Sequence, residues 1–166
     1  LPGVTLPEGL HYSADPACAQ GREMGVFATP SFAVRTTAHA FAPYLAETPL
    51  LVSVTKGIEE GTGYRMSELV SQETGRTVVA LSGPSHAEEV SRGIPTGVVV
   101  ACPERELAER VQNAFMCSRF RVYTSPDTAG IELGAALKNV IALCAGVCDG
   151  MGYGDNTKAL LMTRGL

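Results

Sequence analysis

The sequence predicts an α/β protein, with an open, mostly parallel sheet followed by the start of an all-helical domain. Short runs rich in Val and Leu recur over residues 24–124 without alternating polar residues, which is typical of strands buried on both faces. Stretches with apolar residues at helical spacing separate these runs, as in parallel strands linked by helices. After Asp127 only helical patterns continue. The boundary between the two parts is therefore expected near residue 125.

Each expected strand is a short apolar run that stops at turn-forming residues. The first run stops at Pro30, the second at Lys56-Gly57 and the third at Gly83-Pro84. The five strands are expected at residues 24–29, 50–55, 77–82, 96–102 and 120–124.

The expected helices follow from capping residues and from the spacing of apolar side chains. Ser31 is expected to cap the first helix, and Ser85 with Glu88 matches the S-x-x-E capping box of a short helix. The other helices are expected over residues 31–45, 64–73, 104–115 and 127–147, with a further helix from about residue 155.

Composition limits the class of protein. The 166 residues are 45% apolar and 18% charged, which suits one compact domain, or one domain and part of another, and excludes disorder. The net charge of −4 does not favour nucleic acid as a partner. No apolar run of membrane-spanning length and no signal peptide are recognised. Without an initiator Met, the sequence is interpreted as a piece of a longer protein.

The five cysteines are expected to be reduced, buried thiols of a cytoplasmic protein. Their number is odd, and Cys144 and Cys148 lie within an apolar helical run, where free cysteine behaves as a small hydrophobic residue. The three histidines lie elsewhere in the sequence, so no metal site is expected.

Lys138 is the only charged residue between Leu133 and Cys148. At 100° per residue it lies opposite the apolar stripe of its helix, on a face of glycines and alanines. Small residues let a ligand approach closely, so Lys138 is expected to be partly desolvated, with a lowered pKa. Such a lysine suits proton transfer near neutral pH. The alternative is a lysine whose long side chain reaches solvent.

Three further candidates lie where buried strands end, which is where ligands bind in open α/β sheets. Lys56 follows the second strand and suits a phosphate or a carbonyl oxygen, although an ordinary exposed strand end is the alternative. Gly83 allows close backbone approach, and Ser85 begins the next helix. For Ser85 the alternative is a capping role alone.

Three segments together resemble one enzyme family. They are VSVTKGIE (residues 52–59), LSGPSHAEEVSRGIPTGVVVA (81–101) and the C-terminal segment from residue 120, which contains ELGAALKNV. With the opening LPGVTLPEGL, this combination resembles the bacterial-type NAD(P)-dependent glycerol-3-phosphate dehydrogenases over nearly the whole chain.

The resemblance implies a fold and a reaction. Residues 1–125 would be part of a Rossmann-like dinucleotide-binding domain, and residues 126–166 the start of the helical substrate domain. The enzymes transfer a hydride between NAD or NADP and C2 of dihydroxyacetone phosphate, giving sn-glycerol 3-phosphate for phospholipid synthesis. A cytoplasmic homodimer is also implied.

The resemblance assigns roles to individual residues. Lys138 would be the proton donor and acceptor at the C2 oxygen, and would contact substrate. Lys56 would contact substrate and cofactor. The remaining assignments are Gly83 and Ser85 to the substrate site, Ala87 to the cofactor, and Asn139 to ordering of the site.

Two features depart from the family pattern. The sequence contains no G-x-G-x-x-G motif, so the 166 residues alone are expected to be inactive. His86 and Phe32 stand where the family often has an aromatic residue and a glutamine.

Two alternatives to this function remain. One is a related two-domain dehydrogenase acting on a hydroxy acid, such as 6-phosphogluconate or ketopantoate. The other is a truncated α/β module that binds a partner without catalysis.

Overall fold

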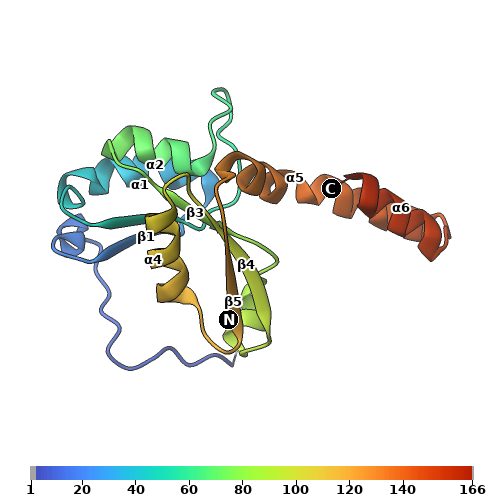
Figure 1. Cartoon of the computed structure of the whole chain (residues 1–166), viewed down its shortest axis with the longest axis horizontal. Coiled ribbons are helices and arrows are strands. Elements are labelled where there is room, and N and C mark those ends of the chain that lie inside the picture. Colours follow the sequence, from blue (N-terminus) through green and yellow to red (C-terminus); the bar gives the residue numbers. More distant parts are fainter. Residues whose placement is uncertain (1–2, 166) are drawn as a thin grey trace.

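A computed structural model, which describes residues 3–165, shows five strands in one sheet (Figure 1). The strands are β1 (Met24–Phe27), β2 (Leu50–Ser53), β3 (Val79–Ser82), β4 (Thr96–Ala101) and β5 (Phe120–Ser125). They lie in the order β1-β2-β3-β4-β5, and every neighbouring pair is parallel except β3 and β4. The predicted α/β fold with a mostly parallel sheet is therefore confirmed.

Helices cover both faces of the sheet. The helices are α1 (Val34–Phe41), α2 (Met66–Thr74), α3 (Ala87–Ser91), α4 (Arg105–Phe115), α5 (Thr128–Gly150) and α6 (Asp155–Gly165), with 3-10 turns at Pro16–Ala19, Ser31–Ala33 and Ala42–Tyr44. Leu51 packs with α1 and α2, whereas its neighbours Leu50 and Val52 pack with α4. Successive strand residues point to opposite faces, and both faces are apolar because both are covered.

The antiparallel pair β3–β4 follows from a short connection. Only the five-residue helix α3 is formed between the two strands, and it is too short to carry the chain back along the sheet. The chain therefore turns at the carboxyl end of β3 and returns beside it. This turn brings Gly83 and Ser85 to the edge where β2 also ends.

Two capping predictions are wrong. The helix expected over residues 31–45 is a 3-10 turn, α1 and a second 3-10 turn, and the structure shows no side-chain cap from Ser31. The N-cap of α3 is His86, and the Ser85 hydroxyl instead donates to the Gly83 carbonyl oxygen at 3.3 Å. Ser85 lies one residue too early because the tight turn after β3 delays the start of the helix.

Helices α5 and α6 form an arm that projects from the sheet (Figure 1). Glu132 is the buried residue of α5, while Leu137 and Leu143 are 54% and 71% exposed. By length and composition α5 could cross a membrane, which is weak evidence because core helices of soluble proteins pass the same test. Every 18-residue window of this helix contains Lys138 and either Glu132 or Asp149, so its apolar sequence is interrupted by charge.

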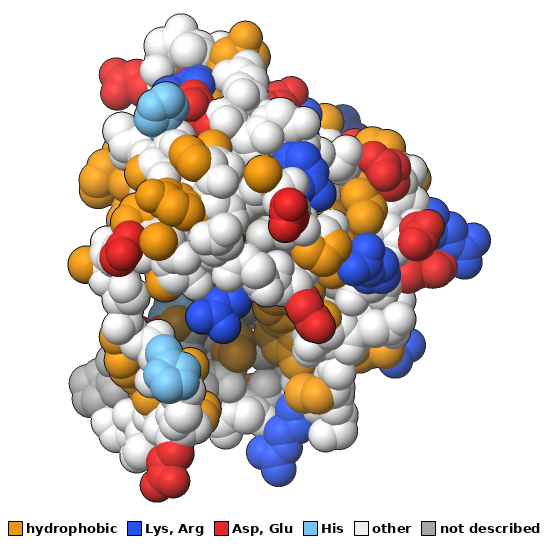
Figure 2. All heavy atoms as spheres, turned by 90° about the vertical axis from the view of Figure 1, so that its left-hand side faces the viewer, with side chains coloured by type: hydrophobic (Ala, Val, Ile, Leu, Met, Phe, Trp, Pro, Cys, Tyr) orange, Lys and Arg blue, Asp and Glu red, His pale blue; other side chains and the backbone are white. Residues whose placement is uncertain are grey.

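The face beside β1 carries charges of both signs. Figure 2 shows Lys and Arg side chains interspersed with Asp and Glu, among hydrophobic and uncharged atoms. Val26 of β1 is 46% exposed at this edge of the sheet.

The cysteine prediction is only partly correct, because Cys102 is buried whereas Cys18 and Cys117 are exposed.

Candidate active site

A cleft of about 690 Å³ opens where the carboxyl ends of β2 and β3 meet α3 and α5. Its lining comes from the loop after β2, the turn after β3, the start of α3 and the small-residue face of α5. The lining residues are Lys56, Gly57, Gly83, Pro84, Ser85, His86, Ala87, Glu88, Glu89, Ala135, Ala136, Lys138 and Asn139. All the residues singled out from the sequence as site residues therefore lie around one cleft, in the place where open α/β sheets bind ligands.

Lys56 is anchored at the floor of this cleft. Its Nζ donates to the Gly83 carbonyl oxygen at 2.9 Å, which ties the loop after β2 to the turn after β3. Partial burial lowers the pKa of Lys56, and the positive charge of Lys138 lowers it further. A lysine of this kind, already partly desolvated, can hold an anionic or carbonyl oxygen strongly.

Lys138 reaches the same cleft from α5. Its Nζ donates to Asn139 Oδ1 at 3.0 Å, and Ala135 and Ala136 of the preceding turn line the cleft beside it. The side chain is exposed, so the predicted desolvation of Lys138 is wrong for the residues described. The small-residue face of α5 does line the cleft, as expected. Of the two lysines, Lys56 is the half-buried one, because it lies at the edge of the sheet, whereas Lys138 lies on the arm.

The backbone of the turn after β3 is closely packed where it lines the cleft. The Gly83 carbonyl accepts hydrogen bonds from both Lys56 and Ser85. A Cβ at Gly83 would lie 2.9 Å from the Val98 Cα, so only glycine lets β4 pass at this distance. Ala87, at the first position of α3, continues the lining.

Acidic side chains also border the cleft. His86 Nδ1 lies 2.5 Å from Glu88 Oε2, and both groups are well exposed. The pKa of Glu88 is lowered by a hydrogen bond from its own backbone amide and then by His86. The two lysines therefore face a carboxylate rim, so an anionic ligand would be drawn to the lysine side.

The family assignment comes from comparison with known proteins. The family described as NAD-dependent glycerol-3-phosphate dehydrogenase matches with its N-terminal part over residues 1–108 and its C-terminal part over residues 127–166. This chain belongs to that family. The stretch between the two matched parts, residues 109–126, contains the end of α4 and strand β5.

Relatives of the dehydrogenase family match the whole chain. A glycerol-3-phosphate dehydrogenase [NAD(P)+] of Pelotomaculum thermopropionicum is 55% identical, over 100% of this chain and 49% of its own length. The crystal structure of glycerol-3-phosphate dehydrogenase from Coxiella burnetii is 32% identical with a TM-score of 0.87, over 99% of this chain and 51% of that chain. The chain thus spans about half the length of these relatives.

A more distant neighbour shares the fold alone. The ketopantoate reductase structure from Ralstonia eutropha matches 80% of this chain and 42% of that chain, with a TM-score of 0.56 and 22% identity. The fold of this chain is therefore also similar to that of a structure with low sequence identity.

A hollow of about 460 Å³ adjoins the cleft at the ends of β1 and β2. Thr29, Ser31 and Thr55 line it, together with Lys56 and Ser85, which it shares with the cleft. The hydroxyl of Thr29 is buried and has no hydrogen-bond partner among residues 3–165. A buried hydroxyl without a partner beside an open hollow fits a polar ligand.

The buried carboxylate of Glu132 was not singled out from the sequence. Its Oε1 accepts from the Ser67 amide at 2.9 Å, and its Oε2 accepts from the Ser67 hydroxyl at 2.6 Å and from Arg65 Nη1 at 2.7 Å. The signal in the sequence was a carboxylate near the start of a long apolar helix that carries only two other charges, Lys138 and Asp149. Sequence spacing could not show its partners, Arg65 and Ser67, which lie at the start of α2.

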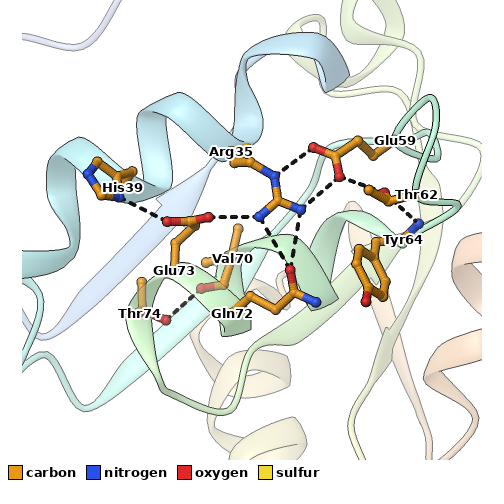
Figure 3. A network of polar contacts seen from close by, with 9 residues as sticks. All are labelled: Arg35, His39, Glu59, Thr62, Tyr64, Val70, Gln72, Glu73 and Thr74. Carbon is orange, nitrogen blue, oxygen red and sulfur yellow. Dashed lines mark hydrogen bonds and ion pairs between the residues drawn. The ribbon is translucent and has the colours of Figure 1, made fainter.

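A second polar cluster fixes the loop that follows Lys56 (Figure 3). Arg35 of α1 binds both carboxylate oxygens of Glu59, at 2.8 and 2.7 Å, and Glu73 of α2 at 2.7 Å. His39 Nδ1 lies 3.0 Å from the second oxygen of Glu73. A bidentate arginine pair has a defined geometry, so this cluster holds the loop from Lys56 onward against both helices.

Proposed function

We propose that this chain forms the catalytic cleft of a glycerol-3-phosphate dehydrogenase that interconverts dihydroxyacetone phosphate and sn-glycerol 3-phosphate with NAD or NADP. The observation that carries the proposal is the meeting of Lys56 and Lys138 at one cleft, although they lie far apart in the sequence and on different parts of the fold. The charge of Lys138 reaches Lys56, which supports a shared site.

The lysines suit the two tasks of a carbonyl reduction. Lys138 would give its Nζ proton to the C2 oxygen as the carbonyl carbon becomes a secondary alcohol, and would take it back in the reverse direction. Lys56 would stabilise negative charge on the substrate oxygens, held in place by the Gly83 carbonyl. Ser85 lies within the same lining and would donate to the substrate.

Part of the cofactor site fits the residues present. The hollow with the partnerless Thr29 hydroxyl adjoins the cleft at Lys56, so Lys56 would face both substrate and cofactor. Ala87, which lines the cleft, would contact the cofactor. A bound reduced nicotinamide would supply the hydride for C2.

The remaining assignments rest on the family. We place residues 1–125 in the dinucleotide-binding domain and residues 126–166 at the start of the helical substrate domain, since β5 ends at Ser125 and α5 begins at Thr128. The homodimer, the cytoplasmic location and the supply of glycerol 3-phosphate for phospholipid synthesis are proposed on the same ground.

The test is the substitution Lys138→Met in the full-length polypeptide. Loss of the proton donor should lower kcat for dihydroxyacetone phosphate by about 10²–10⁴-fold, while NADH binding, followed by its fluorescence, changes by less than about twofold. Lys158→Met is the matched control, because Lys158 pairs with Asp149 on the arm and does not line the cleft.

Three results would contradict the proposal. Near-normal turnover in the Lys138→Met variant would remove the proton-transfer role. Wild-type activity with 6-phosphogluconate or ketopantoate, and none with dihydroxyacetone phosphate, would assign a hydroxy-acid substrate instead. No binding of NADH or NADPH by the wild-type protein would favour a non-catalytic module.

A further inference from the structure

The root of the arm is held by a buried charge cluster. Glu132 is 5% exposed, and its two carboxylate oxygens accept three hydrogen bonds from Arg65 and Ser67. Arg65 donates in turn to Glu68 Oε1 at 2.6 Å. A buried carboxylate is costly unless its partners are complete, and a complete set fixes the position of the group that carries it.

The cluster is unusual because the rest of α5 is not buried. Glu132 is the buried residue of this 23-residue helix, and the neighbouring apolar side chains Leu133 and Leu137 are 40% and 54% exposed. Within the part of the chain described, apolar packing of α5 against the sheet is limited to half-buried side chains of its first turns, such as Ile131, and contributes little to the direction of the helix. The polar contacts at the first turns of α5 therefore set its direction. Asp127 contributes to them, because its side chain caps the helix by accepting from the Gly130 amide at 2.8 Å.

The cluster also connects the two cleft lysines. Lys56 and Arg65 lie at the two ends of one loop, and Arg35 clamps Glu59 in the middle of that loop (Figure 3). Glu132 precedes Lys138 by six positions, which is about 9 Å along a rigid helix. Any rotation or shift of α5 at Glu132 is therefore carried to Lys138.

We propose that Glu132, with Arg65 and Ser67, is a positioning group that sets Lys138 of the arm against Lys56 of the sheet. The inference rests on the proposed function, in which Lys138 exchanges a proton with the substrate. Proton transfer needs hydrogen-bond contact, and a misplacement of about 1 Å can cost about 10²-fold in rate.

The experiment is Glu132→Gln in the full-length polypeptide. The glutamine side chain keeps the shape of glutamate and one acceptor oxygen. Its other polar group is an uncharged NH2 donor, so the ion pair with Arg65 is lost. We expect kcat for dihydroxyacetone phosphate to fall about 10²-fold, while the Kd for NADH changes by less than about twofold. Glu68→Gln is the matched control: it removes a carboxylate from the same arginine without touching α5, and is expected to keep kcat within about twofold.

A pairing test separates the cluster from a general loss of fold. If Arg65 and Glu132 act as a unit, the double variant Arg65→Met/Glu132→Gln should lose no more activity than Glu132→Gln alone. Independent roles would instead multiply the two losses, and that result would overturn the proposal.

Hydrogen exchange supplies a readout that does not depend on activity. In Glu132→Gln, peptides from residues 128–150 should exchange at least about tenfold faster than in Glu68→Gln, while peptides from β2 and β3 should be unchanged. Equal exchange in both variants, with wild-type kcat, would overturn the proposal. Faster exchange throughout the protein would show a purely structural role and would overturn it as well.

The same measurements keep the two proposals apart. If wild-type protein fails to turn over dihydroxyacetone phosphate but α5 alone loosens in Glu132→Gln, the proposed function fails and the positioning of the arm stands. If Lys138→Met is inactive and Glu132→Gln is fully active with a protected α5, the function stands and the positioning role fails.

Discussion

The sheet and the arm bury their apolar side chains to very different extents. All four residues of β2 and of β3 are buried, and Leu69 of α2 is fully covered. In α5, which has a more apolar composition than α1, α2 or α4, Leu143 is 71% exposed. The sheet is therefore located by many apolar contacts, whereas the arm is located by a few polar contacts at its root.

This difference bears directly on the cleft. Lys56, Gly83 and Ser85 come from the sheet, where packing holds the backbone, while Lys138 and Asn139 come from the arm. A site divided in this way depends on the junction between its two halves. Disturbing the sheet should cost stability, whereas disturbing the junction should cost activity.

A matched pair of leucine substitutions gives the largest expected contrast in stability. Leu69→Ala should lower the free energy of unfolding by about 2–5 kcal/mol, because it leaves a cavity among fully buried side chains. Leu143→Ala should change it by less than about 0.5 kcal/mol, because that side chain lies largely in solvent. Urea unfolding of the 166-residue chain measures both. An equal cost at the two positions would mean that the apolar side of α5 is covered.

A pair of glycine substitutions should change the free energy of unfolding by smaller amounts, with opposite signs at the two positions. Gly57 has a φ of +143°, and a Cβ there would lie 2.9 Å from the Ser31 Cβ, so Gly57→Ala should destabilise by about 1–3 kcal/mol. Gly146 lies within α5 with no atom near its Cβ position, so Gly146→Ala should stabilise by about 0.5–1 kcal/mol. Thermal unfolding of both variants beside wild type is the measurement. Stabilisation by both would show that the loop after Lys56 is not held in this conformation.

The smallest effect concerns the clamp on that loop and its dependence on pH. Hydrogen bonds from Arg35, and then from Thr62, lower the pKa of Glu59 from 4.5 to about 2. Because the folded pKa lies below the unfolded value, the stabilisation is complete above about pH 4.5 and is lost as the pH falls toward 2.

Glu59→Gln should therefore differ from wild type most at neutral pH and least near pH 2. Urea unfolding curves measured across this range give the difference in free energy at each pH. Glu60→Gln is the control, since Glu60 makes no ion pair within residues 3–165. A difference independent of pH would exclude the ion pair as its cause.

Most of the sheet and much of the cleft could be predicted from the sequence. Runs such as LLVSV and TVVALS are short, rich in branched apolar residues and followed by turn-forming residues, a pattern that predicts strands buried on both faces. Lys56 and Gly83 were found because strand ends meet at one edge of a parallel sheet. The start of α3 was misplaced at Ser85, since a local capping pattern cannot show how tight the preceding turn is.

The residues that join the halves could not be predicted in this way. Glu132, Arg65 and Ser67 form no motif, because hydrogen bonds between distant segments depend on three-dimensional proximity and not on spacing. The same reason explains why Lys56 is partly buried whereas Lys138 is exposed. Desolvation depends on what packs around a side chain, and one helix considered alone does not contain that information.

By itself, then, the sequence determined which segments are strands and helices, the mostly parallel sheet and the residue types gathered at its carboxyl edge. Hydrophobic patterning is local and repeats with the period of each element, so it can be read along the chain. Only the tertiary structure decided that α5 leaves the sheet as an exposed arm and that a buried carboxylate holds its root. Those features arise from contacts between residues far apart in the chain, whose energies depend on burial and geometry that no local pattern encodes.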